Sequence, residues 1–472
     1  MGDRHDKLHA FAGRLVMVGF GSIGQGVLPL LLRHIEMSPR QLLIVTPGDD
    51  GGAIARAHGV AMLDCALTPD NFRALLEPRL GPGDFLLNLS VDVSSTALIA
   101  LCDELGALYL DTVIEPWAGV YDDGRRPPSA RTNYALRESA LALRRDGTRP
   151  TAVLTHGANP GLVSHFVKRA LLDIARDTAH VAPRPATRED WARLSQALGV
   201  RVIHIAERDT QFSAQRKAVD EFVNTWSVDG FVGEGMQPAE LGWGSHERHF
   251  PGDGARHASG SRAAIYLQRP GASTRVRSWT PAAGAQHAFL ITHAESISIA
   301  DHLTLGDPAS PAYRPTVHYA YHPCDDAVLS VHELAGRNWQ APTRKRIVKD
   351  DIVGGVDALG VLLMGHARGA YWYGSTLSIE RARQLCPHNS ATSLQVTAAV
   401  MAGVVWAMRN PWRGIVEPDD LPCDELLPWC RPYLGDVRGV YTDWTPLAGR
   451  GRLFDEDVDA DDPWQFKNFR VT

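Results

Sequence analysis

Residues 14–35 constrain the fold more than any other stretch of this chain, because a short apolar strand, a glycine-rich turn and an apolar helix follow one another there. The turn reads Gly19-Phe-Gly21-Ser-Ile-Gly24, which is the pattern GxGxxG. In this pattern the first glycine permits the tight turn, the second lets backbone amides approach a pyrophosphate, and the third lets the helix pack on the strand. The segment therefore predicts a dinucleotide site with these contact candidates: Gly19, Gly21, Ser22, Ile23 and Gly24.

Further apolar segments follow at the spacing of alternating strands and helices. A helical pattern such as that of residues 95–105 separates successive strands, which predicts an α/β domain with a Rossmann-like, doubly wound parallel sheet. The strands predicted after the first one cover residues 41–46, 59–64, 84–90, 107–113 and 151–156.

The pattern changes after residue 160, and a chain of 472 residues exceeds the ~250–300 residues that one core usually serves. Strand-like segments at 200–208, 263–268, 274–280 and 288–300 predict a second α+β domain with a largely antiparallel sheet. A capped apolar helix at 389–408 predicts a return to the first domain. The predicted parts are residues 1–156 for the dinucleotide-binding domain, about 388–430 for the segment that completes it, 157–387 for the second domain, and 431–472 for a tail that packs on the body.

Composition narrows the choice of partner and location. The 48 basic and 54 acidic residues give a net charge of −6, and the basic residues are scattered, so we expect no nucleic-acid partner. The longest apolar run, residues 398–408, is about half of the ~20 residues that a membrane helix needs, so it predicts a buried helix and no membrane partner. Six irregularly spaced cysteines without a recognisable signal peptide predict reduced thiols and a cytoplasmic location.

Polar residues follow three of the predicted parallel strands, and the carboxyl ends of such strands share one edge of the sheet. Ser90, Asp92, Glu115 and Asn159 should therefore meet there, although each taken singly could be a cap or turn residue. Asp111 is as well explained by such a structural role as by a ligand. The candidates around the nicotinamide end are Ser90, Val91, Asp92, Asp111, Thr112, Ala158 and Asn159.

One position departs from the usual dinucleotide pattern. An acid normally ends the second strand and holds the adenine ribose, but here that position is Thr46. Threonine can still bond a ribose hydroxyl, and no arginine follows at once to bind a 2′-phosphate. NAD is therefore favoured over NADP, with Thr46 as a further contact candidate.

The segment TWSVDGFVGEG, residues 225–235, holds three glycines and predicts irregular chain that carries Trp226, Asp229 and Glu234. Indole is the best cation–π partner among side chains, and a carboxylate can act as a general base. Trp226 and Glu234 could therefore serve a cationic substrate. The alternative is that Trp226 only fills the core; Asp229 has the character of a turn residue.

Other acids lie in the second domain. They are Glu207 in HIAERDT and Glu240 in PAELGWG, and His293 and Glu295 would share one face of the strand predicted at 288–300. With Asp92 and Glu115 these acids outnumber the nearby cations, Arg208, Arg275 and Arg277. A substrate carboxylate would require an arginine fork, so the excess of acids favours a diamine.

The pattern His318-x-x-x-His322-Pro-Cys324-Asp325 offers metal ligands by type. Without further ligands such a group is more often ordinary packing, so no metal site is predicted.

The motifs MVGFGSIGQGVLPL, NLSVDVSS, THGANPG, FVNTWSVDGFVGEG and THAESISIADHLT are spread over nearly the whole chain. Through them the chain resembles the bacterial homospermidine synthases, within the saccharopine dehydrogenase-like fold superfamily. The resemblance implies a cytoplasmic homodimer that condenses two putrescines, or putrescine and spermidine, into homospermidine. Ammonia or 1,3-diaminopropane would leave, NAD would shuttle a hydride through an imine without net redox change, and residues 157–387 would bind substrate and form the dimer.

The resemblance also assigns roles to residues of this chain. Trp226 would lie over the cationic imine and Glu234 would move protons. The inner amine would be surrounded by Asn159, Glu207, His293 and Glu295, and the middle and outer amines would contact Asp92 and Glu115. Two alternatives remain: a net oxidoreductase of the saccharopine or carboxyspermidine dehydrogenase type, which needs an arginine for its substrate, and a non-catalytic NAD-binding protein.

Overall fold

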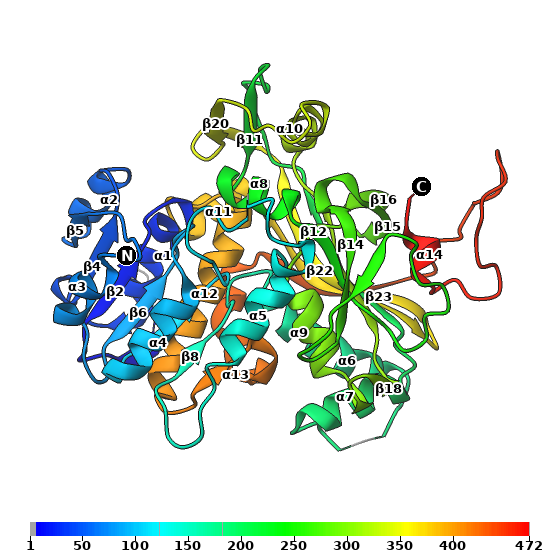
Figure 1. Cartoon of the computed structure of the whole chain (residues 1–472), viewed down its shortest axis with the longest axis horizontal. Coiled ribbons are helices and arrows are strands. Elements are labelled where there is room, and N and C mark those ends of the chain that lie inside the picture. Colours follow the sequence, from blue (N-terminus) through cyan, green and yellow to red (C-terminus); the bar gives the residue numbers. More distant parts are fainter. Residues whose placement is uncertain (1–5, 122, 182, 472) are drawn as a thin grey trace.

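The computed structural model describes residues 6–121, 123–181 and 183–471. Its first sheet, at the left of Figure 1, has seven parallel strands in the order β24-β8-β7-β6-β2-β4-β5. The strands are β2 (Leu15–Val18), β4 (Leu42–Thr46), β5 (Ala61–Asp64), β6 (Phe85–Asn88), β7 (Leu108–Asp111), β8 (Ala152–Val153) and β24 (Ile415–Val416). Strand order reverses between β2 and β6, and ligands of such sheets bind in the crevice at that point. The predicted Rossmann-like fold is confirmed.

Alternate residues of β2 show why the sheet is covered on both faces. Leu15 and Met17 belong to the apolar cluster that contains α1, whereas Val16 and Val18 belong to the cluster that contains α4. Successive side chains of a strand point to opposite faces, so a strand that is apolar throughout needs a helix layer on each side. The helices of the chain include α1 (Ser22–His34), α4 (Ser95–Leu105), α5 (Asn133–Leu141), α6 (Leu162–Asp177) and α12 (Ala391–Arg409).

The second sheet is mixed and has ten strands, as predicted for an α+β unit. Its main path is β13-β14-β12-β19-β9-β22-β23-β25, and β15 and β16 join it through β19. Only β9 and β19 pair in parallel among the described strands of this sheet; its other pairs are antiparallel. The bounds are β9 (Val202–Asp209), β12 (Pro238–Gly242), β13 (Gly254–Arg256), β14 (Ala264–Pro270), β15 (Arg275–Thr280), β16 (Gly284–Phe289), β19 (Thr316–His322), β22 (Val356–His366), β23 (Gly369–Ser378) and β25 (Asp436–Thr442).

The prediction of irregular chain over residues 225–235 is wrong. Most of this segment is helix α8 (Val228–Met236), whose N-cap Ser227 accepts a hydrogen bond from the Gly230 amide. Val228 and Phe231 are 2% and 1% exposed, and their burial offsets the poor helix propensity of the glycines. Gly230 and Glu234 are four residues apart and so lie on one face of the helix.

The strand predicted at 288–300 is wrong beyond Phe289, where β16 ends. Helix α9 (Ala294–His302) follows, with His293 as its N-cap residue and Glu295 in its first turn. Every residue of α9 is buried, so the helix shows no polar face. A helix that is buried all round lacks the 3.6-residue pattern by which an amphipathic helix is recognised.

The chain returns to the first sheet near the predicted place. Helix α12 packs on α1, and β24 extends the parallel sheet beside β8. Ser390 caps α12 with a capping box. By length and composition α12 could cross a membrane, but 94% of its apolar window is buried inside the structure. The domain division itself stays a prediction, since one apolar cluster continues through α12 from the first sheet to the second.

The tail after residue 431 contributes the edge strand β25, which pairs with β23. The loop that follows projects from the right of Figure 1, and Leu453 and Phe454 on it are more than 80% exposed. The tail then folds back through α14 (Phe466–Phe469), which contacts β15. Phe469 is fully buried.

Candidate active site

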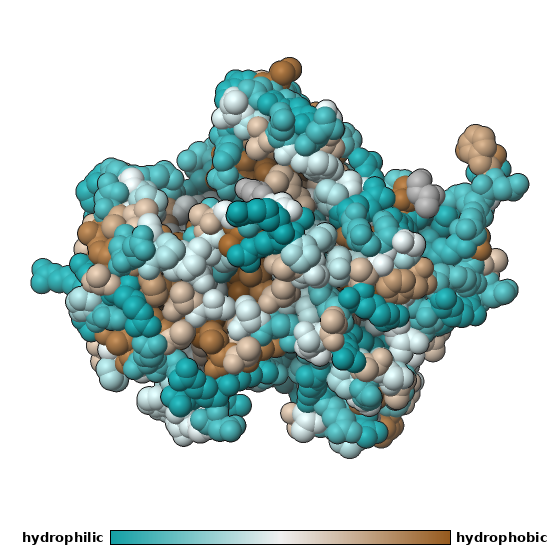
Figure 2. All heavy atoms as spheres, in the orientation of Figure 1, coloured by the Kyte–Doolittle hydropathy of each residue, from teal (hydrophilic) through white to brown (hydrophobic). Residues whose placement is uncertain are grey.

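Two adjoining cavities lie where the carboxyl ends of the parallel strands meet the second sheet. The inner cavity has a volume of about 150 Å³ and the outer one about 420 Å³. Both are lined by Val91, Val113, Glu115, Asn133, Gly230 and Glu234. Figure 2 shows a mostly hydrophilic face, with hydrophobic residues gathered in the hollow between the two halves of the molecule.

Most of the predicted site residues line these cavities. The inner cavity is lined by Ile23, Ser90, Val91, Thr112, Glu115, Ala158, Asn159, Glu207, Trp226, Glu234 and His293. Asp92 lines the outer cavity, and Glu295 lies directly behind His293. The polar side chains that follow the parallel strands therefore lie together at this edge of the sheet, as expected from the positions of the strand ends.

The glycine turn leads from β2 into α1, beside the inner cavity. Gly19 has φ +86°, and a Cβ there would lie 2.7 Å from the Leu89 carbonyl oxygen. A Cβ on Gly24 would lie 2.9 Å from the Gly19 carbonyl oxygen, whereas a Cβ on Gly21 would meet nothing within 4 Å. Helix α1 starts at Ser22 without a side-chain cap and without an acid in its first turn. Its free amides and the open space at Gly21 fit a pyrophosphate.

Thr46 ends β4, as predicted, and is half-buried. The carboxylate at this corner comes from the neighbouring strand, where Asp64 is in register with Thr46 and accepts a hydrogen bond from the Gly48 amide at 2.7 Å. This corner of the sheet thus has an acid one strand away from its usual position.

Asp111 does not line either cavity. It is fully buried, and its carboxylate accepts hydrogen bonds from the Tyr109 hydroxyl at 2.8 Å and the Thr155 amide at 2.6 Å. Burial raises the pKa of Asp111 to about 7. These contacts give Asp111 a structural role between β7 and β8, the alternative left open by the sequence.

His293 lies between two carboxylates. Its Nε2 is 3.1 Å from Glu234 Oε2, and its Nδ1 is 3.2 Å from Glu295 Oε1. Burial opposes a charge on the ring, but Glu295 and Glu234 together raise the pKa of His293 well above its usual value. A protonated imidazole can donate from both nitrogens, so a row Glu234–His293–Glu295 reaches from the cavity into the core.

Glu207 forms the acidic wall at the inner end. It accepts hydrogen bonds from the Asn159 side-chain amide at 3.0 Å and from the Tyr319 hydroxyl. Burial raises the pKa of Glu207 to about 8. A cationic amine at this place would restore the charge on the carboxylate.

Glu115 forms a second acidic wall and is shared by both cavities. Burial, followed by the charges of Asp92 and Glu234, raises the pKa of Glu115 to about 8. Glu115 is buried, Glu234 is half-buried and Asp92 is exposed, and three carboxylates that repel one another in this way favour a cation between them.

Trp226 lines the inner cavity from the segment before α8. Its indole Nε1 donates to the Tyr321 hydroxyl at 3.0 Å. A Cβ on Gly230 would lie 3.2 Å from Trp226 Cζ3, so the absence of a side chain lets α8 pass close to the ring. Asp229 lies exposed in the first turn of α8 and pairs with Lys345 rather than forming a turn.

No arginine lines either cavity among the described residues. The three nearby arginines bind elsewhere: Arg208 to Asp325, Arg275 to His332 and Arg277 to Glu456. His318 packs against His204, with ring centroids 4.0 Å apart, whereas His322 contacts Arg208. Among the described residues no group of three or more metal-ligating side chains is arranged around one point.

Sequence reasoning missed several residues that line the cavities, among them Asn133, Tyr319, Tyr121 and Lys345. Tyr319 lies on β19, whose parallel neighbour β9 carries Glu207. Asn133 begins α5, far along the chain from any predicted strand end. Only the Thr132 N-cap signal could have found the start of this helix, and it says nothing of the cavity.

Two family models match the chain in succession. The saccharopine dehydrogenase NADP binding domain matches residues 15–153, and the saccharopine dehydrogenase C-terminal domain matches residues 157–442. An apo saccharopine dehydrogenase from Saccharomyces cerevisiae aligns with a TM-score of 0.50 at 8% identity over 91% of this chain and 100% of that one, which shows likeness of fold alone.

The relatives of high sequence identity reported below are all homospermidine synthases. A homospermidine synthase from Blastochloris viridis is 56% identical over 470 residues, 98% of each chain, and one from Mesorhizobium japonicum is 50% identical over 469 residues, 97% of this chain and 96% of that one. The crystal structure of the homospermidine synthase from Legionella pneumophila in complex with NAD aligns with a TM-score of 0.92 at 48% identity, over 98% of both chains. The chain therefore belongs to the homospermidine synthase family of enzymes, built on the saccharopine dehydrogenase fold.

Proposed function

We propose that this enzyme joins two putrescines into homospermidine with release of ammonia, and that spermidine can replace one putrescine with release of 1,3-diaminopropane. The observation that carries the proposal is a pair of joined cavities walled by Glu115, Glu207 and Glu234, with Trp226 beside them. A slender dication satisfies such walls, and the high sequence identity to homospermidine synthases supports the same substrate.

NAD fits the glycine turn and the adjoining strand ends, and when bound it would accept a hydride from the amine-bearing carbon and later return it. The residues proposed to hold it are Gly19, Gly21, Ser22, Ile23, Gly24, Thr46, Ser90, Val91, Thr112 and Ala158. Asp111 would support this edge of the sheet from behind.

The protein side chains would then handle amines and protons. Asn159 and Glu207 would hold the inner amine by hydrogen bonds. Removal of two hydrogens from a primary amine leaves a C=N carbon, which the free amine of the second diamine attacks; one C–N bond forms, and the bond to the departing ammonia breaks. Glu234 would take the proton from the attacking nitrogen and return one to the leaving nitrogen, with His293 and Glu295 behind it.

Trp226 would offer its ring face to the iminium cation, an interaction worth about 2 kcal/mol or more when water is excluded. Asp92 and Glu115 would hold the middle and outer amines. Because the hydride returns to the joined product, the sum of the steps contains no net oxidation.

The test is turnover of putrescine with less NAD than product. Homospermidine and ammonia should each exceed the NAD supplied, measured by chromatography and an ammonia assay. NADH that accumulates in step with product would instead identify a net oxidoreductase of the saccharopine or carboxyspermidine dehydrogenase type. That alternative also needs an arginine for a substrate carboxylate, and none lines the cavities among the described residues.

No turnover of any diamine in the presence of bound NAD would favour a non-catalytic NAD-binding protein. The homodimer stays a prediction from the resemblance, and the cytoplasmic location stays a prediction from the cysteine pattern and the resemblance. Sedimentation and cell fractionation would test them.

A further inference from the structure

Asn133 lines both cavities, at the place where they join, yet no sequence signal marked it. It is 6% exposed and shares this place with Glu115 and Glu234. A nitrogen of the substrate that lay at the junction would meet all three side chains. The question is whether Asn133 presents its amide oxygen or its amide nitrogen to the substrate.

The orientation of the Asn133 amide is set by Glu240, which lines neither cavity. Glu240 is fully buried, and its carboxylate accepts hydrogen bonds from the Asn133 amide at 2.7 Å and the Tyr134 amide at 3.2 Å. These are the first two backbone amides of α5, so the carboxylate also complements the positive end of the helix dipole. The same carboxylate is 2.6 Å from Thr292 Oγ1.

The chemistry of the donors then determines the direction of every bond. A carboxylate only accepts, so the Thr292 hydroxyl donates its one hydrogen to Glu240. Thr292 Oγ1 must therefore accept from its other neighbour, which is Asn133 Nδ2 at 3.0 Å. The second amide hydrogen of Asn133 is directed toward Gln237 Oε1 at 3.5 Å.

The amide oxygen of Asn133 is the atom left over. Among the described residues it has no hydrogen-bond partner, although both hydrogens of the amide nitrogen are directed at acceptors. We propose that the row Glu240–Thr292–Asn133 holds Asn133 Oδ1 as a neutral acceptor for the nitrogen at which the two diamines are joined. The proposal rests on the proposed function and adds a substrate contact, Asn133, and two positioning residues, Glu240 and Thr292.

A neutral acceptor has a physical advantage at this place. A third carboxylate beside Glu115 and Glu234 would repel both, whereas an amide oxygen accepts a hydrogen bond without adding charge. It can serve the joining nitrogen both as an ammonium and as a neutral amine, as long as that nitrogen keeps a hydrogen. The charge on this nitrogen changes during condensation, so such tolerance suits it.

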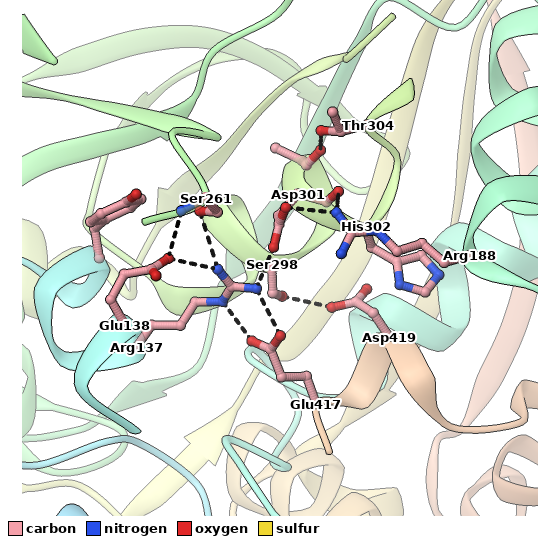
Figure 3. Close-up of polar contacts among 12 residues, drawn as sticks. Arg137, Glu138, Arg188, Ser261, Ser298, Asp301, His302, Thr304, Glu417 and Asp419 are labelled. Atoms are coloured by element: carbon pink, nitrogen blue, oxygen red, sulfur yellow. Dashed lines mark hydrogen bonds and ion pairs between the residues drawn. The ribbon is translucent and has the colours of Figure 1, made fainter. Parts of the chain in front are cut away.

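The helix that carries Asn133 is anchored one turn further on. Arg137 is buried and donates to Asp301 at the end of α9 and to Glu417 directly after β24, as Figure 3 shows. Thr292 and His293 precede the same helix α9. The start and the middle of α5 are thus bonded to the two ends of α9, and these bonds hold the backbone that carries Asn133 and Thr292 in place.

The test uses NAD-loaded full-length enzyme and four variants. Asn133→Ala should raise KM for putrescine about tenfold or more, since it removes one hydrogen bond to a charged group. Thr292→Val should do nearly the same, because the amide loses its acceptor and can turn its nitrogen to the cavity. Thr292→Ser should restore KM, and the double variant Asn133→Ala/Thr292→Val should be no worse than the worse single variant.

Tyr134→Phe is the control on the same helix, because the Tyr134 hydroxyl bonds Ser259 and Arg262 and takes no part in the row. It should leave KM and NAD affinity unchanged. Unchanged KM in Thr292→Val, or additive effects in the double variant, would overturn the proposal. A wild-type enzyme that makes no homospermidine would refute the proposed function instead, so the two failures are distinguishable.

Discussion

Arg137 offers the sharpest prediction of stability in this structure. Its guanidinium, 2% exposed, donates to Glu417 at 2.6 and 2.7 Å and to Asp301 at 2.7 Å. Arg137→Met keeps an apolar side chain of similar length but removes these three short bonds, together with longer ones to Glu138 at 3.3 Å and Ser261 at 3.4 Å. Asp301 retains Arg188, whose guanidinium is 2.6 Å away, so Glu417 bears most of the loss.

Leaving one partner of a buried ion pair without its counter-charge costs about 3–5 kcal/mol. We therefore expect the free energy of unfolding to fall by about 3–5 kcal/mol in Arg137→Met, measured by urea titration followed by tryptophan fluorescence. Circular dichroism should give a coincident transition, which licenses the use of one free energy.

Two controls separate the charge effect from a simple packing defect. Glu138→Gln removes a longer contact of 3.3 Å at a side chain that is 26% exposed, and it should cost at most about 1 kcal/mol. The pair Arg137→Met/Glu417→Leu removes both charges and should recover most of the lost stability. A single variant that loses less than about 1 kcal/mol, or a double variant no more stable than Arg137→Met, would refute the reasoning.

Three further predictions concern the site. Glu234→Gln should lower kcat about 100-fold or more with NAD still bound, and near-normal turnover of this variant would remove Glu234 as the base. Trp226→Phe should keep part of the activity and Trp226→Ala almost none, and equal losses would indicate shape rather than charge. Glu115 and Glu207, with pKa values raised to about 8, should release protons when a dication binds at pH 7; calorimetry in two buffers of different ionisation enthalpy should show this release, and Glu115→Gln should reduce it. Because the folded protein keeps these protons above the usual glutamate pKa, both groups should also make the ligand-free enzyme less stable as pH rises toward and through 8.

Local signals predicted much of the fold. Helix α4 spans residues 95–105 as predicted, and the capped apolar helix predicted at 389–408 is α12, which Ser390 caps. The apolar strands and the glycine turn likewise follow from short-range chemistry. These features depend on neighbours within a few residues, so they can be predicted from the local sequence.

The two wrong predictions have a common cause. Glycines in 225–235 indicated loop, but burial of Val228 and Phe231 makes that segment helical. Helix α9 was mistaken for a strand because all its residues are buried and no polar face gives a helical period. In both segments, contacts with distant residues outweighed local preference.

In the candidate site, too, some features depend on local sequence and others on contacts between distant residues. The glycine turn, the acids at the strand ends and the types of side chain that suit a diamine could all be predicted from the sequence alone. Tertiary structure decided that Glu234 reaches His293, that Asp111 faces the core, and that Asn133 joins the site through Glu240, 107 residues further along the chain. The physical reason is that burial and the direction of a hydrogen bond depend on which distant groups the fold brings together.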